Sequence, residues 1–146
     1  MEQITRGIRN NNPGNIRFNV ANRWNGQIGP DGDGYIIFDT MKNGVRALTK
    51  ILRTYRNQGC LSIHDTIARW APPQDNNDTL AYIKDVAKRM QLDTLIPVPA
   101  DRVRDLVAAI IHHENGQDIL EDVLNSGVAS AYSYMLIDQV DQEKPK

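Results

Sequence analysis

The sequence contains one cysteine, Cys60, among its 146 residues, so no disulfide within the chain can hold the fold together. It also lacks an apolar run long enough to cross a membrane, and its first residues show no signal-peptide pattern. We therefore expect synthesis in a host cytoplasm without a signal peptide, no membrane span, and delivery by another factor if the protein acts elsewhere.

Motifs for several kinds of chemistry are missing as well. There is no phosphate-binding Gly-rich loop and no Gly-x-Gly-x-x-Gly fingerprint. His112 and His113 precede Glu114, but the His-Glu-x-x-His spacing of zinc proteases is absent. We therefore predict no metal site and no cofactor.

The charge balance gives no general signal for a nucleic-acid or membrane partner, because the formal net charge is -1. Residues 1–25 are locally basic and could face an anionic polymer. Against Glu2 alone, they hold Arg6, Arg9, Arg17 and Arg23. These arginines are not interleaved with a row of aromatic side chains, as a single-strand binder would require, so we expect no nucleic-acid partner.

The overall composition is that of a globular protein, with 40% hydrophobic and 24% charged residues. We expect one domain over residues 1–141 and a polar, mobile tail over residues 142–146. Apolar residues at helical spacing predict most of the secondary structure. The expected helices cover residues 43–58, 62–70, 80–90 and 101–116, then run from Ile119 to a stop at Gly127, and finally over 128–140.

The N-terminal part of the chain shows no helical period. Residues 1–19 are rich in Asn, Gly and Arg and predict a surface loop, and residues 24–38 predict a β-hairpin around a Gly-Pro-Asp-Gly turn. Asp31 and Asp33 are interpreted as turn residues rather than calcium ligands, because Tyr35 stands where an oxygen ligand should be. The predicted fold class is α+β, mostly α, with a small N-terminal β-hairpin.

The helix expected over residues 101–116 carries an acid, Glu114, on its apolar side. The apolar stripe consists of Val103, Leu106, Val107, Ile110 and Ile111, and Glu114 continues the same spacing. Burial and the negative end of the helix dipole both favour the neutral acid, which is the form that a general acid needs. The alternative is an ordinary C-terminal helix residue whose side chain bends back to solvent.

Asn and aromatic residues elsewhere have the chemistry of a sugar-binding cleft. They occur in the Asn-rich N-terminal loop, in the hairpin with Trp24, and between Trp70 and Tyr82. Amides hydrogen-bond hydroxyl and N-acetyl groups, and flat rings stack on pyranose faces. Together with an acid that protonates a glycosidic oxygen, these residues indicate glycan cleavage.

Several motifs resemble those of a set of small bacteriophage proteins usually labelled virion structural proteins. The motifs are RGIRNNNPGNI at 6–16, Trp24-x-Gly26, Phe38, Gly44-x-Arg46-Ala47, Tyr55, RWAPP at 69–73, NNxTxxY at 76–82 and HENG at 113–116. That set is related to a phage endopeptidase-type lysin with a lysozyme-like fold. The resemblance implies a lysozyme-like domain and association with a phage virion.

A more distant similarity connects the chain to glucosaminidases and lytic transglycosylases of the lysozyme superfamily. In those enzymes a helix ends in Glu-Ser-Gly, an Asn-x-x-x-Ile stretch leads into a hairpin, and a Tyr-containing segment lines the cleft. Glu114-Asn115-Gly116, residues 12–16 and the segment from Trp70 to Tyr82 are similar to these three features. Asn115 replaces the usual Ser, and the acid helix comes last instead of first, which implies a circular permutation.

These resemblances imply a peptidoglycan hydrolase that cleaves the glycan strand, of the lytic transglycosylase or muramidase type, with Glu114 as general acid. The expected substrate-binding residues are Asn12, Asn15, Trp24, Trp70, Asn77 and Tyr82. The expected partner is peptidoglycan, reached at the cell wall, in the periplasm or as part of a virion. Two alternatives remain: a non-catalytic virion or wall-binding protein, and a peptidoglycan endopeptidase.

Overall fold

The computed structural model describes residues 4–133, and the elements expected beyond Ser133, including the tail at 142–146, lie outside them. The described chain is mostly helical with one two-stranded antiparallel sheet, so the predicted α+β class is confirmed. In chain order the elements are α1 (Arg6–Arg9), β1 (Gln27–Pro30), β2 (Ile36–Phe38), α2 (Met41–Asn57), α3 (Ile63–Trp70), η1 (Pro73–Asp75), α4 (Thr79–Met90), η2 (Ala100–Arg102), α5 (Val103–Asn115) and α6 (Glu121–Ala131).

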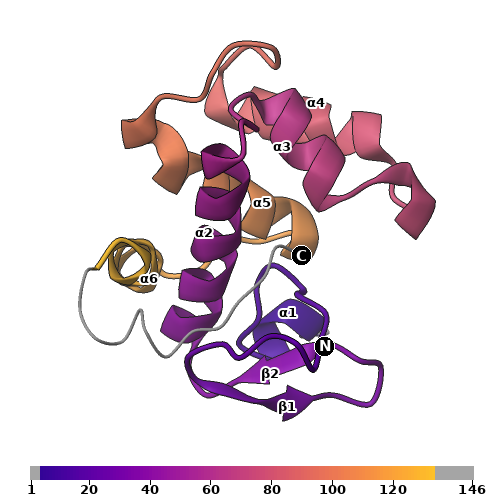
Figure 1. Cartoon of the computed structure of the whole chain (residues 1–146), viewed down its shortest axis with the longest axis vertical. Helices are drawn as coiled ribbons and strands as arrows, with labels where there is room; N and C mark the ends of the chain where they lie inside the picture. The colour runs from indigo at the N-terminus through magenta and orange to yellow at the C-terminus, as the bar shows by residue number, and fades with distance from the viewer. Residues whose placement is uncertain (1–3, 134–146) are drawn as a thin grey trace.

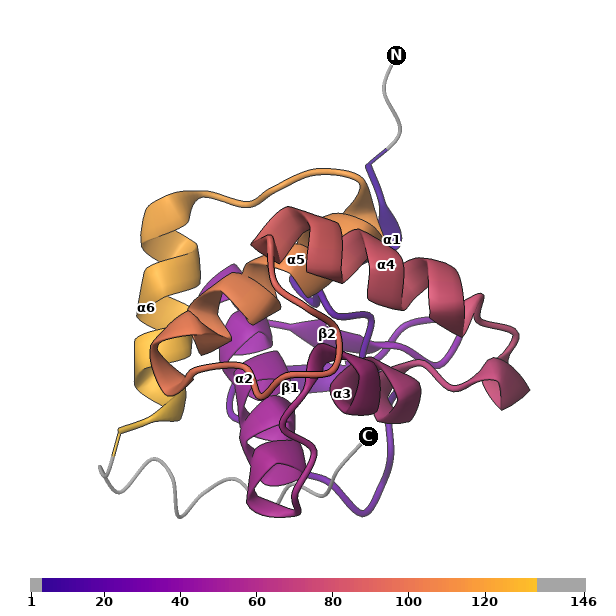
Figure 2. The ribbon, with the colours of Figure 1, turned by 90° about the horizontal axis from the view of Figure 1, so that it is seen from above.

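Helix α2 runs through the middle of the molecule and connects two lobes (Figure 1). One lobe holds α1 and the hairpin, and the other holds α3 and α4. Helix α6 packs against α2 on one side, and α5 lies beside α4 (Figure 2). The buried hydrophobic side chains form one core cluster to which α2, α3, α4, α5 and the hairpin all contribute.

Side-chain caps start three of the helices within two residues of the starts that the sequence predicts. The hydroxyl oxygens of Thr40 and Ser62 accept hydrogen bonds from backbone N–H groups three residues later, and so does the carboxylate of Asp78. Helix α3 ends at Trp70, as expected from the two prolines that follow. Helix α5 ends at Asn115, and Gly116 follows it with a left-handed φ of 69°, which favours glycine. No helix within residues 4–133 is long and apolar enough to span a membrane.

Two expectations about local structure were wrong. Residues 6–9 form the single helical turn α1 inside the stretch expected to be a loop, because Gly7 lets this turn pack directly against Asn115. Gly127 does not stop a helix but lies within α6. A Cβ atom at Gly127 would lie 2.6 Å from the side chain of Val45. Gly127 is therefore a position of close approach between α6 and α2 rather than a helix end.

Asp31 holds the hairpin turn in shape, as its interpretation as a turn residue requires. The turn lies over residues 31–34 rather than at the expected Gly-Pro-Asp-Gly, because Gly29 and Pro30 belong to β1. The Asp31 Oδ1 accepts hydrogen bonds from the backbone N–H groups of Asp33 (2.8 Å) and Tyr35 (2.9 Å), and its Oδ2 accepts one from Asn10 Nδ2 (2.8 Å). These bonds, led by that from Tyr35, lower the pKa of Asp31 from 3.8 to about 2.

This lowered pKa predicts that the free energy of unfolding decreases as pH falls from about 4 to about 2. The folded-state pKa of Asp31 lies below the unfolded value, so its stabilisation is present above about pH 4 and is lost as pH falls towards 2. We expect Asp31→Asn, which can still accept hydrogen bonds but does not titrate, to lose less stability than the wild type over this window. Urea unfolding between pH 5 and pH 2.5 measures the difference, and parallel curves for the two proteins would contradict the prediction.

Candidate functional site

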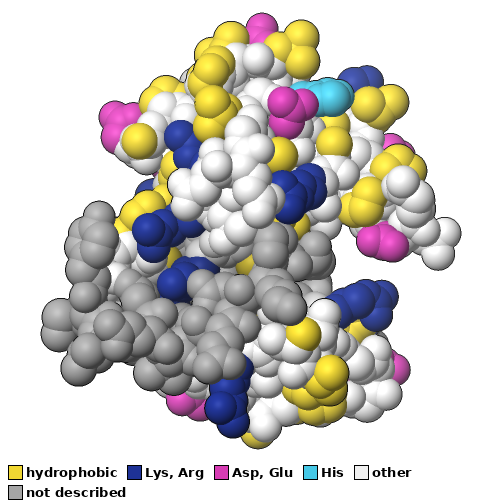
Figure 3. All heavy atoms as spheres, viewed as in Figure 1, with side chains coloured by type: hydrophobic (Ala, Val, Ile, Leu, Met, Phe, Trp, Pro, Cys, Tyr) yellow, Lys and Arg dark blue, Asp and Glu magenta, His cyan; other side chains and the backbone are white. Residues whose placement is uncertain are grey.

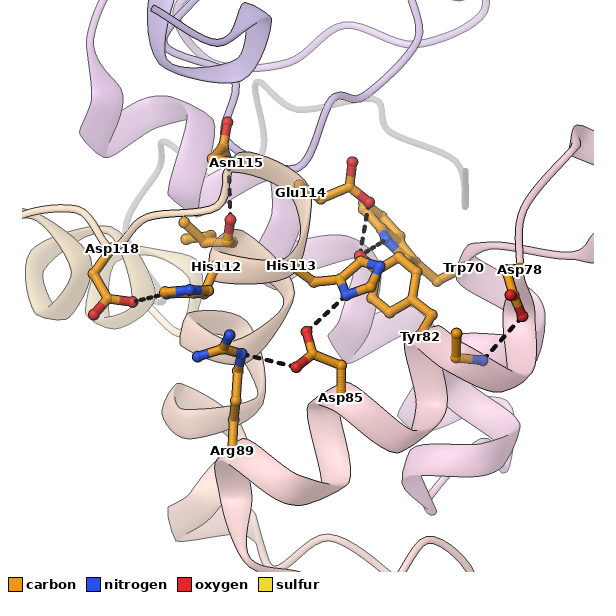
Figure 4. A network of polar contacts seen from close by, with 12 residues as sticks. Trp70, Asp78, Tyr82, Asp85, Arg89, His112, His113, Glu114, Asn115 and Asp118 are labelled. Atoms are coloured by element: carbon orange, nitrogen blue, oxygen red, sulfur yellow. Dashed lines mark hydrogen bonds and ion pairs between the residues drawn. The ribbon is translucent and has the colours of Figure 1, made fainter. Parts of the chain in front are cut away.

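Glu114 lies in the last turn of α5 and points between the two lobes (Figure 4). One carboxyl oxygen accepts a hydrogen bond from Asn15 Nδ2 (3.0 Å) and the other from the hydroxyl of Tyr82 (2.7 Å). Asn15 belongs to the N-terminal loop and Tyr82 to α4, so residues from three distant parts of the chain meet at this carboxyl. The side chain is half-buried and does not bend back into open solvent.

Tyr82 is held in the orientation that it needs to bind Glu114. Its ring is 3% exposed, and its hydroxyl also accepts a hydrogen bond from Trp70 Nε1 (3.1 Å). Burial, together with the nearby charge of Glu114, raises the pKa of Tyr82 well above 10. The phenol therefore stays protonated at all ordinary pH values and donates a hydrogen bond to the Glu114 carboxyl.

A second set of polar contacts supports Tyr82 from the other side (Figure 4). The imidazole of His113 stacks on the Tyr82 ring with 3.7 Å between centroids. Its Nδ1 lies 2.7 Å from a carboxylate oxygen of Asp85, which also pairs with Arg89. Burial alone would raise the pKa of Asp85, but the hydrogen bonds from His113 and Arg89 hold it below 3.8. His113 thus links α5 to α4 next to the acid.

The N-terminal loop is fastened to the end of α5 by Asn115, the neighbour of the acid. The Asn115 side chain, 6% exposed, accepts a hydrogen bond from the Thr5 hydroxyl (2.9 Å) and donates to the carbonyl oxygens of Pro13 and Ile111. The loop itself turns at Asn15, whose φ is 51°. This fastening sets the distance between Asn15 and Glu114.

Glu114 lines a cavity of about 180 Å³ between the lobes, and a neighbouring hollow of about 340 Å³ shares part of its wall. Figure 3 shows a notch between the lobes on the side where η1 projects. Arg17, Trp70 and Asp75 line both hollows, so the two lie side by side and are together called the cleft below. The smaller part is lined by Arg6, Asn15, Arg17, Tyr35, Trp70, Ala71, Asp75, Asn77 and Glu114.

Two of the expected substrate-binding residues line this cleft with groups that a ligand can reach. Asn15 and Asn77 line the smaller cavity beside Glu114, and the Asn77 amide also donates to the Pro72 carbonyl (3.1 Å). Trp24 lines the larger hollow but is only 4% exposed, so it offers a ligand little of its indole face.

The other three are buried as well. Trp70 contributes to both cavity walls but is only 2% exposed, and Tyr82 is similarly buried, so their rings orient the carboxyl rather than offer a face to a sugar. Asn12 is completely buried, and its side chain bonds to the backbone of Ile16 and Ile36. Asn12 therefore shapes the loop that carries Asn15 and is not retained as a ligand contact.

The structure also brings together cleft residues that sequence reasoning missed. Tyr35 lies beneath the guanidinium groups of Arg6 and Arg17, and Asp75 lines both parts of the cleft. The sequence did show a basic N-terminal segment, but nothing in it placed two of its arginines on the ring of a hairpin tyrosine.

A larger hollow of about 470 Å³ lies between α4 and α5, away from Glu114. It contains three arginines, but each has a carboxylate partner: Arg89 with Asp85, Arg102 with Asp105, and Arg104 with both Asp105 and Glu121. Their charges are largely compensated, so this hollow is a weaker candidate for binding. Among residues 4–133 no group of three His, Cys, Asp or Glu side chains is arranged to hold a metal ion.

Comparison with known proteins gives the chain a relative in a bacteriophage. Protein P5 of Pseudoalteromonas phage PM2 is 36% identical over 122 residues, which cover 81% of this chain and 76% of that protein. The chain belongs to the P5 family. The predicted bacteriophage relationship is thereby confirmed. No protein-family model matches the sequence, and the name of the P5 relative states no activity.

Proposed function

We propose that this P5-family protein cleaves the glycan strand of peptidoglycan by a lytic-transglycosylase reaction, with Glu114 as the catalytic residue. The observation that carries the proposal is a carboxyl held by Tyr82 and Asn15 on the wall of a cleft between two lobes. Asn15 and Tyr82 both lie outside α5, so their hydrogen bonds hold the carboxyl in position before substrate arrives. The lysozyme-like interpretation and the circular permutation are part of this proposal.

The reaction needs one protein carboxyl in two roles. Glu114 gives its proton to the glycosidic oxygen as the bond to the anomeric carbon breaks. A hydroxyl of the same sugar then bonds to the anomeric carbon and passes its proton to the Glu114 carboxylate. The acid is regenerated, no water is consumed, and the new chain end carries an internal anhydro ring.

Replacement of Asp75 tests the one-carboxyl mechanism, because Asp75 is the other acid among the described residues that line the Glu114 cavity. It is exposed, at the end of η1. We expect Asp75→Asn to lower glycan cleavage by less than about tenfold, against the roughly 10²- to 10⁴-fold that general acid–base catalysis contributes. Initial rates of release of soluble fragments from purified sacculi measure this. A loss as large as that of a Glu114 variant would indicate a two-carboxylate hydrolase instead.

The direct test of the function is the product. Purified sacculi are digested with the wild-type protein and the soluble fragments are analysed by mass spectrometry. Anhydro ends, lighter by one water than reducing ends, are expected. Reducing ends would replace the transglycosylase mechanism by hydrolysis, and cleaved stem peptides would favour the endopeptidase alternative.

The second candidate function is a non-catalytic virion or wall-binding protein. The phage relative favours it, and so does the fact that both Glu114 oxygens already have hydrogen-bond partners, as in a structural carboxylate. In that case the wild-type protein would bind sacculi or purified virions without releasing any fragment. The same digest therefore separates the two functions.

A further inference from the structure

The wall of the cleft that faces Glu114 from the N-terminal lobe is positively charged. The guanidinium carbons of Arg6 and Arg17 lie 3.7 Å and 4.6 Å from the centroid of the Tyr35 ring. All three side chains line the same cavity as Glu114. The acids of that cavity, Glu114 and Asp75, come from the helical lobe instead.

These two positive charges have no carboxylate partner within ion-pair distance among residues 4–133. The charge of Arg6 helps to lower the pKa of Asp31. The Nε atom of Arg6, however, is buried and has no hydrogen-bond acceptor among these residues. Asn15 Oδ1 in the same cavity wall is likewise buried without a partner. The arginines of the hollow between α4 and α5, in contrast, are all paired with acids. Two cations on one aromatic ring repel each other, and a bound anion would relieve that repulsion.

We propose that Arg6 and Arg17, positioned by Tyr35, bind a carboxylate of the substrate next to the bond that Glu114 cleaves. A guanidinium group binds a carboxylate through two parallel hydrogen bonds, and stacking on the ring reduces the number of orientations that the group can adopt. This inference deepens the proposed function: the substrate is a carboxylate-bearing peptidoglycan strand rather than a neutral N-acetylglucosamine polymer.

The test measures binding in the absence of cleavage, so that it does not depend on the catalytic proposal. Full-length protein with Glu114→Gln is sedimented with insoluble sacculi, either native or with their carboxyl groups converted to amides. We expect Arg17→Gln to weaken binding to native sacculi about tenfold, the loss of one charge-assisted hydrogen-bonded contact. We expect it to have no effect on amidated sacculi, which wild-type Arg17 cannot recognise either.

Two further variants serve as controls. Arg9→Gln removes the same charge from α1, but Arg9 is exposed and does not line the cavity, so binding should be unchanged. Tyr35→Phe keeps the ring beneath the guanidinium groups and should bind like the parent, whereas Tyr35→Leu should weaken binding as Arg17→Gln does. Arg17 is itself exposed, so its replacement leaves the core intact.

Peptide-free glycan strands distinguish the source of the carboxylate. They lack the stem peptides, and removal of a peptide frees the lactyl carboxyl group from its amide bond. Lost binding therefore identifies a peptide carboxylate, and retained binding shows that a free lactyl carboxylate is sufficient. Equal binding of native and amidated sacculi, equal weakening by Arg9→Gln, or no binding at all would overturn the inference. An intact Arg17 effect without any glycan cleavage by the wild type would instead overturn the proposed function and leave this site standing.

Discussion

Glu114→Gln is expected to reduce glycan cleavage by roughly 10²- to 10⁴-fold, the range that general acid–base catalysis contributes. Glutamine has the shape of the acid but no proton to give to the leaving oxygen. The carbonyl oxygen of Gln at 114 can still accept a hydrogen bond from Tyr82. The Asn15 amide can turn over so that its Oδ1, which has no partner in the wild type, accepts a hydrogen bond from the glutamine NH₂ group. The variant should therefore fold.

The measurement compares the rate of fragment release from sacculi with the midpoint of thermal unfolding for each protein. Glu121→Gln is the matched control, because it makes the same chemical change at an exposed carboxylate on α6, outside the cleft. Activity should be unchanged in that control. A Glu114→Gln protein that still cleaves at the wild-type rate would remove Glu114 from the mechanism.

Gly44→Ala is expected to destabilise the fold by about 3 kcal/mol or more, at the upper end of the cost of overpacking. A Cβ atom at Gly44 would lie 1.9 Å from the backbone oxygen of Asn11 and 2.9 Å from Pro13 Cδ. Alanine favours a helix over glycine by about 1 kcal/mol. This preference cannot compensate, because a backbone oxygen cannot rotate away as a flexible side chain would.

The same change should lower activity more than stability alone explains. Asn11 and Pro13 belong to the loop that carries Asn15 to Glu114, so displacing this loop from α2 moves Asn15 as well. Urea unfolding measures the stability and sacculus digestion measures the activity. Gly32→Ala is the control, since nothing lies within 4 Å of a Cβ atom there. Equal stability of the two variants would show that the loop yields easily at Gly44.

Elements defined by local chemistry were predictable from the sequence. The stripe ending at Glu114, the serine cap of α3 and the glycine at the end of α5 each depend on residues a few positions apart. The acid itself was found in this way, because its helical position follows from Val103 and its successors. Its side chain is half-buried and does not take the alternative course back to open solvent.

Features set by packing between distant segments were not predictable. Gly127 has the residue type of a helix stop, and only the approach of α2 to α6 gives it another role. Trp70 and Tyr82 have the residue type of sugar-stacking rings, yet both are buried behind the carboxyl. The stacking of Arg6 and Arg17 on Tyr35 depends on how the N-terminal loop packs against the hairpin. The spacing of hydrophobic residues in the sequence does not predict this packing.

The fastening of the N-terminal loop to the end of α5 has a consequence for biosynthesis. The hydrogen bonds from Asn15 to Glu114 and from Thr5 to Asn115 join residues 99 and 110 positions apart. Until a ribosome has added α5, the loop can contact β2 and α2, but Asn15 and Thr5 lack their partners. Closing so long a segment costs entropy that the packed core offsets. The carboxyl and its partners can therefore come together only after α5 has been made, so a translation product that stops before α5 would carry no assembled cleft.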